Sequence, residues 1–212
     1  MLKPDAFPDT VAALCQAGER FGKRQWTMAT GGNFSARLSA GTFLITRSGV
    51  DKDSLSEHQL MICEVSGEPL DAELQPSAES PLHALLYRLR PEVGAVLHTH
   101  SVTSTVLSRS TQNDLRVCGF EMQKALSGIT THEQQVCFPV FENTQDMAVL
   151  AAQVERRFSS DESLPPGFLV RGHGLYAWGN SIAQAVRHVE GFEFLCACLW
   201  QEHLAGTLGE AP

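Results

Sequence analysis

The stretch Val93-Gly94-Ala95-Val96-Leu97-His98-Thr99-His100 decides how the rest of the chain is interpreted. Its small and β-branched residues at 93–97 predict a buried β-strand that ends in His98 and His100. Residues two apart on a strand point to the same face, with Cα atoms about 6.6 Å apart. Both imidazoles can therefore lean onto one zinc ion. The pair alone fits ordinary polar residues at a strand end equally well, because two histidines leave a metal site incomplete.

His173 is the candidate for a third metal ligand. Glycine on both sides, at Gly172 and Gly174, frees the backbone and clears space around the imidazole. An incidental histidine in a turn is the alternative. Three neutral imidazoles would leave the full charge on zinc and an open position for a substrate oxygen. The other histidines lack paired spacing and are expected at the surface or behind the site: His58, His83, His132, His188 and His203.

Three turns rich in small residues predict a pocket for an anion such as phosphate. They lie at Gly31-Gly32-Asn33, at Ser48-Gly49 and at Ser77-Ala78, the last before a predicted helix. Backbone N–H groups and hydroxyls at such turns suit a phosphate, and a helix N-terminus adds partial positive charge. Lys52 would add a full charge. Each turn taken alone also fits an ordinary turn, and no P-loop or Gly-x-Gly-x-x-Gly pattern indicates a nucleotide-binding fold.

Two glutamates are candidates for acid/base catalysis. Glu79 falls in the first turn of a predicted helix, where a carboxylate also has a purely structural use against the helix dipole. Glu121 lies between Phe120 and Met122 in a stretch with few charges. An apolar setting there would raise its pKa toward the range that is useful for proton transfer at neutral pH.

The composition excludes several classes of protein. The chain has 212 residues, 43% hydrophobic and 19% charged, which predicts one globular domain over 1–212. A net charge of -8 without a basic run argues against nucleic acid as the partner. No apolar run approaches the roughly 20 residues of a membrane span, and no signal-peptide core is present. The six cysteines form no Cys-x-x-Cys pair, so we expect reduced thiols and a cytoplasmic protein.

Helices and strands alternate along the chain, which predicts a layered α/β domain with a mixed sheet. Helices are expected at 9–23, from about 76 to 90, through 102–107, at 144–158 and at 181–203. Strands are expected at 34–38, 42–46, 61–65, 93–97, 136–140, 168–170 and 174–178. The segment 115–128 reads as a strand or loop followed by a short helical piece. Ser54 and Glu57 have capping-box spacing, Thr144 is the expected cap of its helix, and Pro139 marks a strand edge or end.

Five segments of the chain resemble, in their order, those of the class II aldolase and adducin family: GGNFSARL, ITRSGV, PSAESPLHALLY, AVLHTHS and RGHGLYAWG. The resemblance covers nearly the whole length. It implies a three-layer α/β domain with a central, mainly antiparallel sheet, and a homo-oligomer, commonly a tetramer with sites near subunit boundaries. It also implies one zinc ion per subunit on His98, His100 and His173, and substrate phosphate at Gly32, Asn33, Ser48, Gly49 and Ser77.

Within the family, the chain is most similar to enzymes of methionine salvage, on residues 171–179, the Glu121-Met122 segment and residues 141–144. This implies zinc-dependent dehydration of 5-methylthioribulose 1-phosphate to 5-methylthio-2,3-dioxopentyl phosphate, through a metal-stabilised enediolate. By position, Glu121 matches the acid/base of the dehydratases. Glu79 matches the carboxylate of the sugar-phosphate aldolases, at a position that some dehydratases fill with cysteine, so the division of roles between the two stays open.

Two alternatives remain at this point. An aldolase or 4-epimerase of the fuculose- or ribulose-phosphate type would use a similar metal and phosphate site. Such relatives use a tyrosine near the C-terminus, and this chain has none after Tyr176. A non-catalytic, adducin-like interaction module need not keep the three histidines, whereas this chain has all of them.

Overall fold

The computed structural model describes residues 2–112, 114–161 and 163–206. A seven-stranded sheet forms its centre, in the order β3-β2-β1-β4-β9-β8-β7. All neighbouring strands are antiparallel except β7 and β8, which confirms the predicted mixed, mainly antiparallel sheet. The strands are β1 Asn33–Arg37, β2 Thr42–Thr46, β3 Leu60–Glu64, β4 Ala95–Thr99, β7 Val140–Phe141, β8 Gly167–Val170 and β9 Gly174–Gly179; β5 Leu115–Val117 and β6 Val136–Phe138 pair separately.

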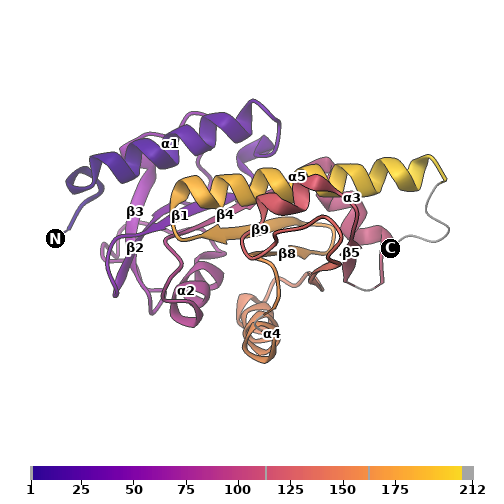
Figure 1. The fold of residues 1–212 in the computed structure, drawn as a ribbon. Coiled ribbons are helices and arrows are strands. Elements are labelled where there is room, and N and C mark those ends of the chain that lie inside the picture. Colours follow the sequence, from indigo (N-terminus) through magenta and orange to yellow (C-terminus); the bar gives the residue numbers. More distant parts are fainter. Residues whose placement is uncertain (1, 113, 162, 207–212) are drawn as a thin grey trace.

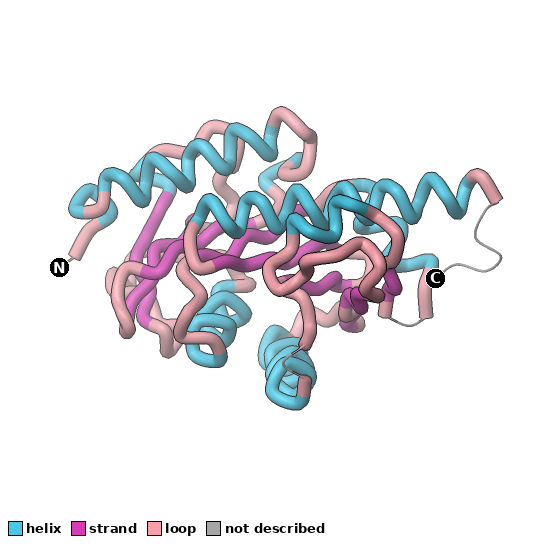
Figure 2. The backbone as a smooth tube through the Cα atoms, viewed as in Figure 1, coloured by secondary structure: helices cyan, strands magenta, loops and turns pink. Residues whose placement is uncertain are grey.

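Helices cover both faces of the sheet and complete three layers. Long helices α1 and α5 lie above the sheet in Figure 1, and α2 and α4 lie below it. Figure 2 shows the same layering, with the strands running between the two groups of helices. The α-helices of the described residues are α1 Pro8–Gly22, α2 Ser80–Leu89, α3 Val102–Ser110, α4 Met147–Ser160 and α5 Ile182–Leu204. None of them is both long and apolar enough to cross a membrane.

The strand alternation divides the hydrophobic core into two clusters. Ala95 and Leu97 pack with residues of α1 and α5, whereas Val96 packs with residues of α2 and α4. His98 shares the face of Val96, and Thr99 shares that of Leu97, because successive side chains point to opposite faces. The end of β4 therefore sends its two histidines toward the layer of α2 and α4, and the threonine between them toward α5.

Two predicted caps are corrected by the structure. Helix α4 is capped by Asp146, whose carboxylate accepts from the backbone N–H groups of Ala148 and Val149, while the Thr144 hydroxyl accepts from Asp146. Threonine and aspartate are both good N-cap residues, so residue type alone does not decide between Thr144 and Asp146. The capping box lies at Ser56 and Gln59, two residues later than expected.

The expected single strand at 136–140 is two strands. Pro139 has no N–H to donate to a ladder, and the strand divides there into β6 and β7. The first pairs with β5 and the second with β8, so the proline is the point at which the chain passes from the small sheet to the large one. All six cysteines are free thiols, as predicted.

Candidate active site

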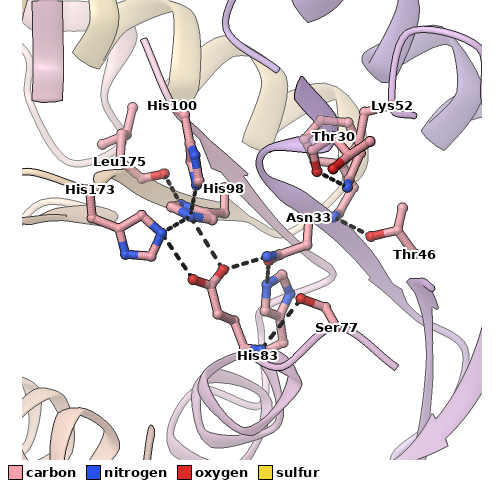
Figure 3. Close-up of polar contacts among 12 residues, drawn as sticks. Thr30, Asn33, Thr46, Lys52, Ser77, His83, His98, His100, His173 and Leu175 are labelled. Atoms are coloured by element: carbon pink, nitrogen blue, oxygen red, sulfur yellow. Dashed lines mark hydrogen bonds and ion pairs between the residues drawn. The ribbon is translucent and has the colours of Figure 1, made fainter. Parts of the chain in front are cut away.

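The structure brings the three predicted histidines together (Figure 3). His98 Nε2 lies 2.7 Å from His100 Nε2 and 3.3 Å from His173 Nε2. His98 and His100 come from the end of β4 and the residue after it, and His173 from the turn between β8 and β9. Antiparallel pairing of β4 with β9 carries that turn to the end of β4, because Thr99 lies opposite Leu175.

The protonation state of the cluster suits a metal ion. His98 Nδ1 donates to the carbonyl oxygen of Leu175 at 2.8 Å, which leaves Nε2 as the free donor atom facing the other two rings. Burial holds the pKa of His98 well below its usual value, and burial followed by the nearby His173 lowers the pKa of His100 to about 4. These imidazoles are neutral at pH 7, which is the form that binds metals.

Aromatic stacking fixes the ring of His98 in its place. Tyr176 lies almost parallel to it, with ring centroids 3.9 Å apart and an interplanar angle of 10°. Phe168 stacks on the other face of Tyr176, with centroids 4.9 Å apart. Three rings from three neighbouring strands therefore form one stack, which limits the rotation of His98.

Two glycines allow the backbone to approach the cluster closely. A Cβ atom on Gly174 would overlap the carbonyl oxygen of Thr99, and one on Gly32 would overlap the carbonyl oxygen of His98. Gly32 also has a φ of +76°, in the region that favours glycine. The glycine beside His173 is thus required for the strand pairing that delivers this histidine.

Glu79 is the carboxylate that lies beside the histidines. Its Oε1 is 3.0 Å from His173 Nε2 and its Oε2 is 3.3 Å from His98 Nε2. Burial opposes a charge on this carboxyl, but His98, His173 and the amide of Asn33 lower its pKa below the usual range. The sequence predicts Glu79 in the first turn of a helix. In the structure it is the N-cap residue of α2, one position before that turn. The site therefore combines three imidazoles with one carboxylate.

Within the described residues, Glu121 does not contact the three histidines. It begins a short 3-10 helix, η4 (Glu121–Ala125), and its side chain is 67% exposed. It pairs with Lys124 and with His132, whose Nδ1 lies 3.1 Å away. The prediction of an apolar setting for Glu121 is wrong, because its side chain is exposed and paired with charged or polar groups. The hydrogen bond from Lys124 is the main cause that lowers the pKa of Glu121. The spacing of three residues between Glu121 and Lys124 is one at which ion pairs form on a helix, whereas no spacing indicated His132.

Two of the predicted anion-binding turns lie side by side. The backbone N–H of Ser48 donates to the carbonyl oxygen of Gln75 at 3.1 Å, and Arg47 forms a β-bridge with Pro76. Gly49 and Ser77 are thereby brought to the same region of the surface. Ser48 and Gly49 are exposed and Ser77 is half-buried, so all three are open to a ligand.

The remaining predicted phosphate residues are partly engaged by the protein itself. Lys52 is buried, and its ammonium donates to the carbonyl oxygens of Thr30 and Val50. The pKa of Lys52 is lowered, because the effect of burial outweighs those of the nearby Asp51 and Glu79, which raise it. The side-chain amide of Asn33 donates to Glu79 Oε2 at 2.5 Å.

Two separate hollows lie near these glutamates. A cleft of about 660 Å³ opens onto Glu79, His100 and His173 and is walled by α3 and the segment leading into α4. A larger hollow of about 930 Å³ lies along α5 and is lined by Glu121 and Met122. No lining residue is common to both, so Glu79 and Glu121 of one subunit face different spaces.

Buried side chains behind the cluster support the site; His83 was expected at the surface or behind the site, whereas Glu193 was not predicted. His83 is fully buried and bonded to Asn33, and Glu193 on α5 accepts hydrogen bonds from Thr99 and Ser101 on either side of His100. One signal was available. His83 follows Glu79 by four residues, the spacing that places two side chains on the same face of a helix.

Comparisons with known proteins show the family of the chain. The family model described as Class II Aldolase and Adducin N-terminal domain matches residues 12–200. A methylthioribulose-1-phosphate dehydratase from Yersinia enterocolitica is 48% identical over 195 residues, 92% of each chain. Another with that name, from Serratia proteamaculans, is 49% identical over 193 residues, 91% of this chain and 94% of the relative.

Solved structures show the same fold. An L-fuculose-1-phosphate aldolase from Thermus thermophilus is 26% identical, with a TM-score of 0.73 over 96% of this chain and 98% of that one. A putative aldolase/epimerase/decarboxylase from Escherichia coli has a TM-score of 0.75 at 24% identity, over 89% of this chain and 87% of that one. The latter identity supports the fold alone.

Proposed function

The chain belongs to the class II aldolase and adducin family, and from this premise we propose that it dehydrates 5-methylthioribulose 1-phosphate to 5-methylthio-2,3-dioxopentyl phosphate in methionine salvage. The observation that carries the proposal is the cluster of His98, His100 and His173 with the Glu79 carboxylate, at the edge of a cleft. Relatives that are 48% and 49% identical over nearly the whole chain, and that are named for this reaction, support the choice of substrate.

The donor set fits one zinc ion per subunit. His98, His100 and His173 would hold it through Nε2, since three neutral imidazoles are the ligands of a typical catalytic zinc site. When bound, zinc polarises the ketose carbonyl and stabilises the negative charge that develops on its oxygen. The phosphate of the substrate is assigned to Ser48, Gly49, Ser77 and Gly32, with Lys52 and the second amide hydrogen of Asn33 nearby.

The reaction needs one base and one acid. A proton leaves C3 of the substrate, and the C4 hydroxyl departs with a proton as water. The Glu79 carboxylate lies against His98 and His173, so it is placed to accept a proton close to the metal. The two glutamates of one subunit cannot share this work directly, because they face different hollows.

We infer that Glu121 serves the metal site of an adjacent subunit in a homo-oligomer, with a tetramer as the expected form. Its side chain is exposed and stands next to Met122 and Phe194, which are also exposed. Large apolar side chains grouped around a hollow favour coverage by another protein surface. A second copy of the chain would bury them and bring the Glu121 carboxylate to the histidine cluster of its neighbour.

The decisive experiment incubates the zinc-loaded protein with 5-methylthioribulose 1-phosphate and follows the 2,3-diketone after condensation with an aromatic 1,2-diamine. We expect turnover that depends on zinc. Absence of diketone from protein that holds one zinc per subunit would reject the proposal. Loss of substrate with release of a three-carbon ketose phosphate would instead identify an aldolase, the second candidate, which the similarity to the Thermus thermophilus enzyme favours. Protein that binds no zinc would support the interaction module.

A further inference from the structure

A chain of hydrogen-bonded, buried polar side chains runs from Glu79 into the protein, and Figure 3 shows its first part, at Asn33 and His83. Asn33 Nδ2 donates to Glu79 Oε2 at 2.5 Å, and Asn33 Oδ1 lies 2.5 Å from His83 Nε2. His83 Nδ1 lies 2.6 Å from Ser35 Oγ, which lies 2.8 Å from the hydroxyl of Tyr87. Asn33, Ser35, His83 and Tyr87 are each at most 3% exposed. Four hydrogen bonds thus connect the carboxylate to the interior without a gap.

The Glu79 carboxylate determines the direction of every hydrogen bond in this row of side chains. A carboxylate only accepts, so the Asn33 amide must donate with its nitrogen and accept with its oxygen. His83 then carries its hydrogen on Nε2. Burial lowers the pKa of His83 to about 4, so the ring is neutral at pH 7 and its Nδ1 accepts from Ser35. The Ser35 oxygen in turn accepts from Tyr87, and all donors point toward Glu79.

The alternative orientation of the Asn33 amide is excluded by the Glu79 carboxylate. A flipped amide would place its oxygen against that carboxylate, where neither group can donate, and buried polar groups without a partner are strongly disfavoured. His83 takes the tautomer that suits this orientation, and its N–H then holds the amide oxygen in place.

The hydrogen-bonded row is built from the regular residue spacings of one helix and one strand. Glu79, His83 and Tyr87 follow one another at intervals of four along α2, which places them on one helical face. Asn33 and Ser35 are two apart on β1 and point to one face of the sheet. The two rows interleave where α2 packs on the sheet, so neighbouring members alternate between helix and strand.

We propose that His83 and Ser35 are positioning residues, which lock the Asn33 amide and through it hold Glu79 toward His98 and His173. Tyr87 completes the chain. The role in turnover rests on the function proposed above, whereas the effect on the carboxylate itself does not. Neither residue hydrogen-bonds to the metal ligands, so the hydrogen-bond route from both to the site runs through Asn33 and Glu79.

The first test compares His83→Phe with His83→Gln. Phenylalanine keeps a planar ring but removes both nitrogens, whereas glutamine keeps one donor and one acceptor. We expect His83→Phe to retain zinc and to lower kcat about 10-fold or more, the scale of one positioning hydrogen bond, with a smaller change in KM. His83→Gln should recover part of the loss. Equal kcat in His83→Phe and the unsubstituted protein would overturn the proposal.

The second test does not depend on substrate. Visible d–d spectra of the Co²⁺-loaded protein report the donors and geometry around the metal. We expect His83→Phe to change the spectrum in the same direction as Glu79→Gln, and the double variant to match Glu79→Gln alone. Independent, additive changes would show that His83 does not act through Glu79. A spectral change without dehydratase activity would uphold the positioning role and reject only the proposed reaction.

His188 provides the matched control. It is a second buried histidine, which donates from Nδ1 to the Trp178 carbonyl at 2.5 Å and accepts from Ser127. His188→Phe should lower the unfolding temperature and leave the Co²⁺ spectrum unchanged. If His83→Phe does not fold, Ser35→Ala removes the donor to His83 Nδ1 with little change in volume. It should shift the spectrum in the same direction, and an unaltered spectrum in that variant would count against the proposal.

Discussion

Asn33 on β1 lies directly opposite His98 on β4 in the antiparallel ladder. One cross-strand pair therefore carries both the amide that holds the Glu79 carboxylate and the first histidine of the proposed metal site. A register slip of one residue would turn one partner to the other face of the sheet. Backbone pairing thus sets the position of the amide relative to the histidine.

Loss of one histidine should abolish metal binding and activity together. His98→Ala leaves two imidazoles, and it removes the ring that Leu175 and Tyr176 hold in place. We expect less than stoichiometric zinc by elemental analysis and no measurable turnover. His58→Ala is the control, since the His58 side chain is 87% exposed and should keep both. Full activity in metal-free His98→Ala would contradict the metal site.

Glu121→Gln should keep its zinc and lose turnover. The substitution removes an exposed carboxylate that pairs with Lys124 and His132 and touches none of the three histidines. We expect kcat to fall about 100-fold or more, in the range typical of a lost general acid or base. Retained turnover would transfer the acid/base role to Glu79 alone.

Mixed oligomers can show whether Glu121 acts across a subunit boundary. Inactive His98→Ala and Glu121→Gln subunits, unfolded together and refolded, should regain activity. Some sites in such oligomers combine an intact histidine cluster from one subunit with Glu121 from another. Kinetics of each variant refolded alone provide the baseline. Mixed oligomers as inactive as either parent would place both groups in the same subunit.

Gly174→Ala should weaken metal binding more than it weakens the fold. The added methyl would overlap the carbonyl oxygen of Thr99 and lie 3.2 Å from His100 Cδ2, forcing β4 and β9 apart beside the site. Overpacking of this kind costs roughly 1–3 kcal/mol. We expect a lower unfolding temperature and a raised Kd for zinc in competition with a chelating dye. Gly41→Ala meets no atom within 4 Å and should change neither.

Glu193 should make the stability of the protein fall as the pH rises. Burial raises its pKa to about 7, against hydrogen bonds from Ser101 and Thr99 that favour the charged form. A raised folded-state pKa means that stabilisation is complete below the unfolded value of 4.5 and is lost as the pH approaches 7. Relative to Glu193→Gln, the protein should lose on the order of 3 kcal/mol of unfolding free energy between pH 5 and 8. Urea denaturation in the presence of a chelator measures this, and parallel pH curves would contradict it.

Local rules predicted much of the site and of the fold. The pairing of His98 with His100 follows from the two-residue repeat of a strand, and the glycines around His173 follow from close backbone approach. Alternating helical and strand patterns indicated the layers, and the resemblance to a family indicated the mainly antiparallel sheet. Where two residues of equal propensity competed for one cap, as Thr144 and Asp146 did, local rules could not decide.

By itself, the sequence determined that two histidines share one face of a buried strand, because that relation spans three residues and depends on backbone geometry alone. Only the tertiary structure decided which glutamate lies beside them. Glu79 reaches His98 and His173 because the N-terminal end of α2 lies, in space, beside the C-terminal end of β4. In contrast, η4 packs on α5, so Glu121 lines another hollow. Hydrogen-bond partners such as Asn33 and His83 lie 50 residues apart. Strand register and helix packing bring them together, and neither is encoded in any short segment.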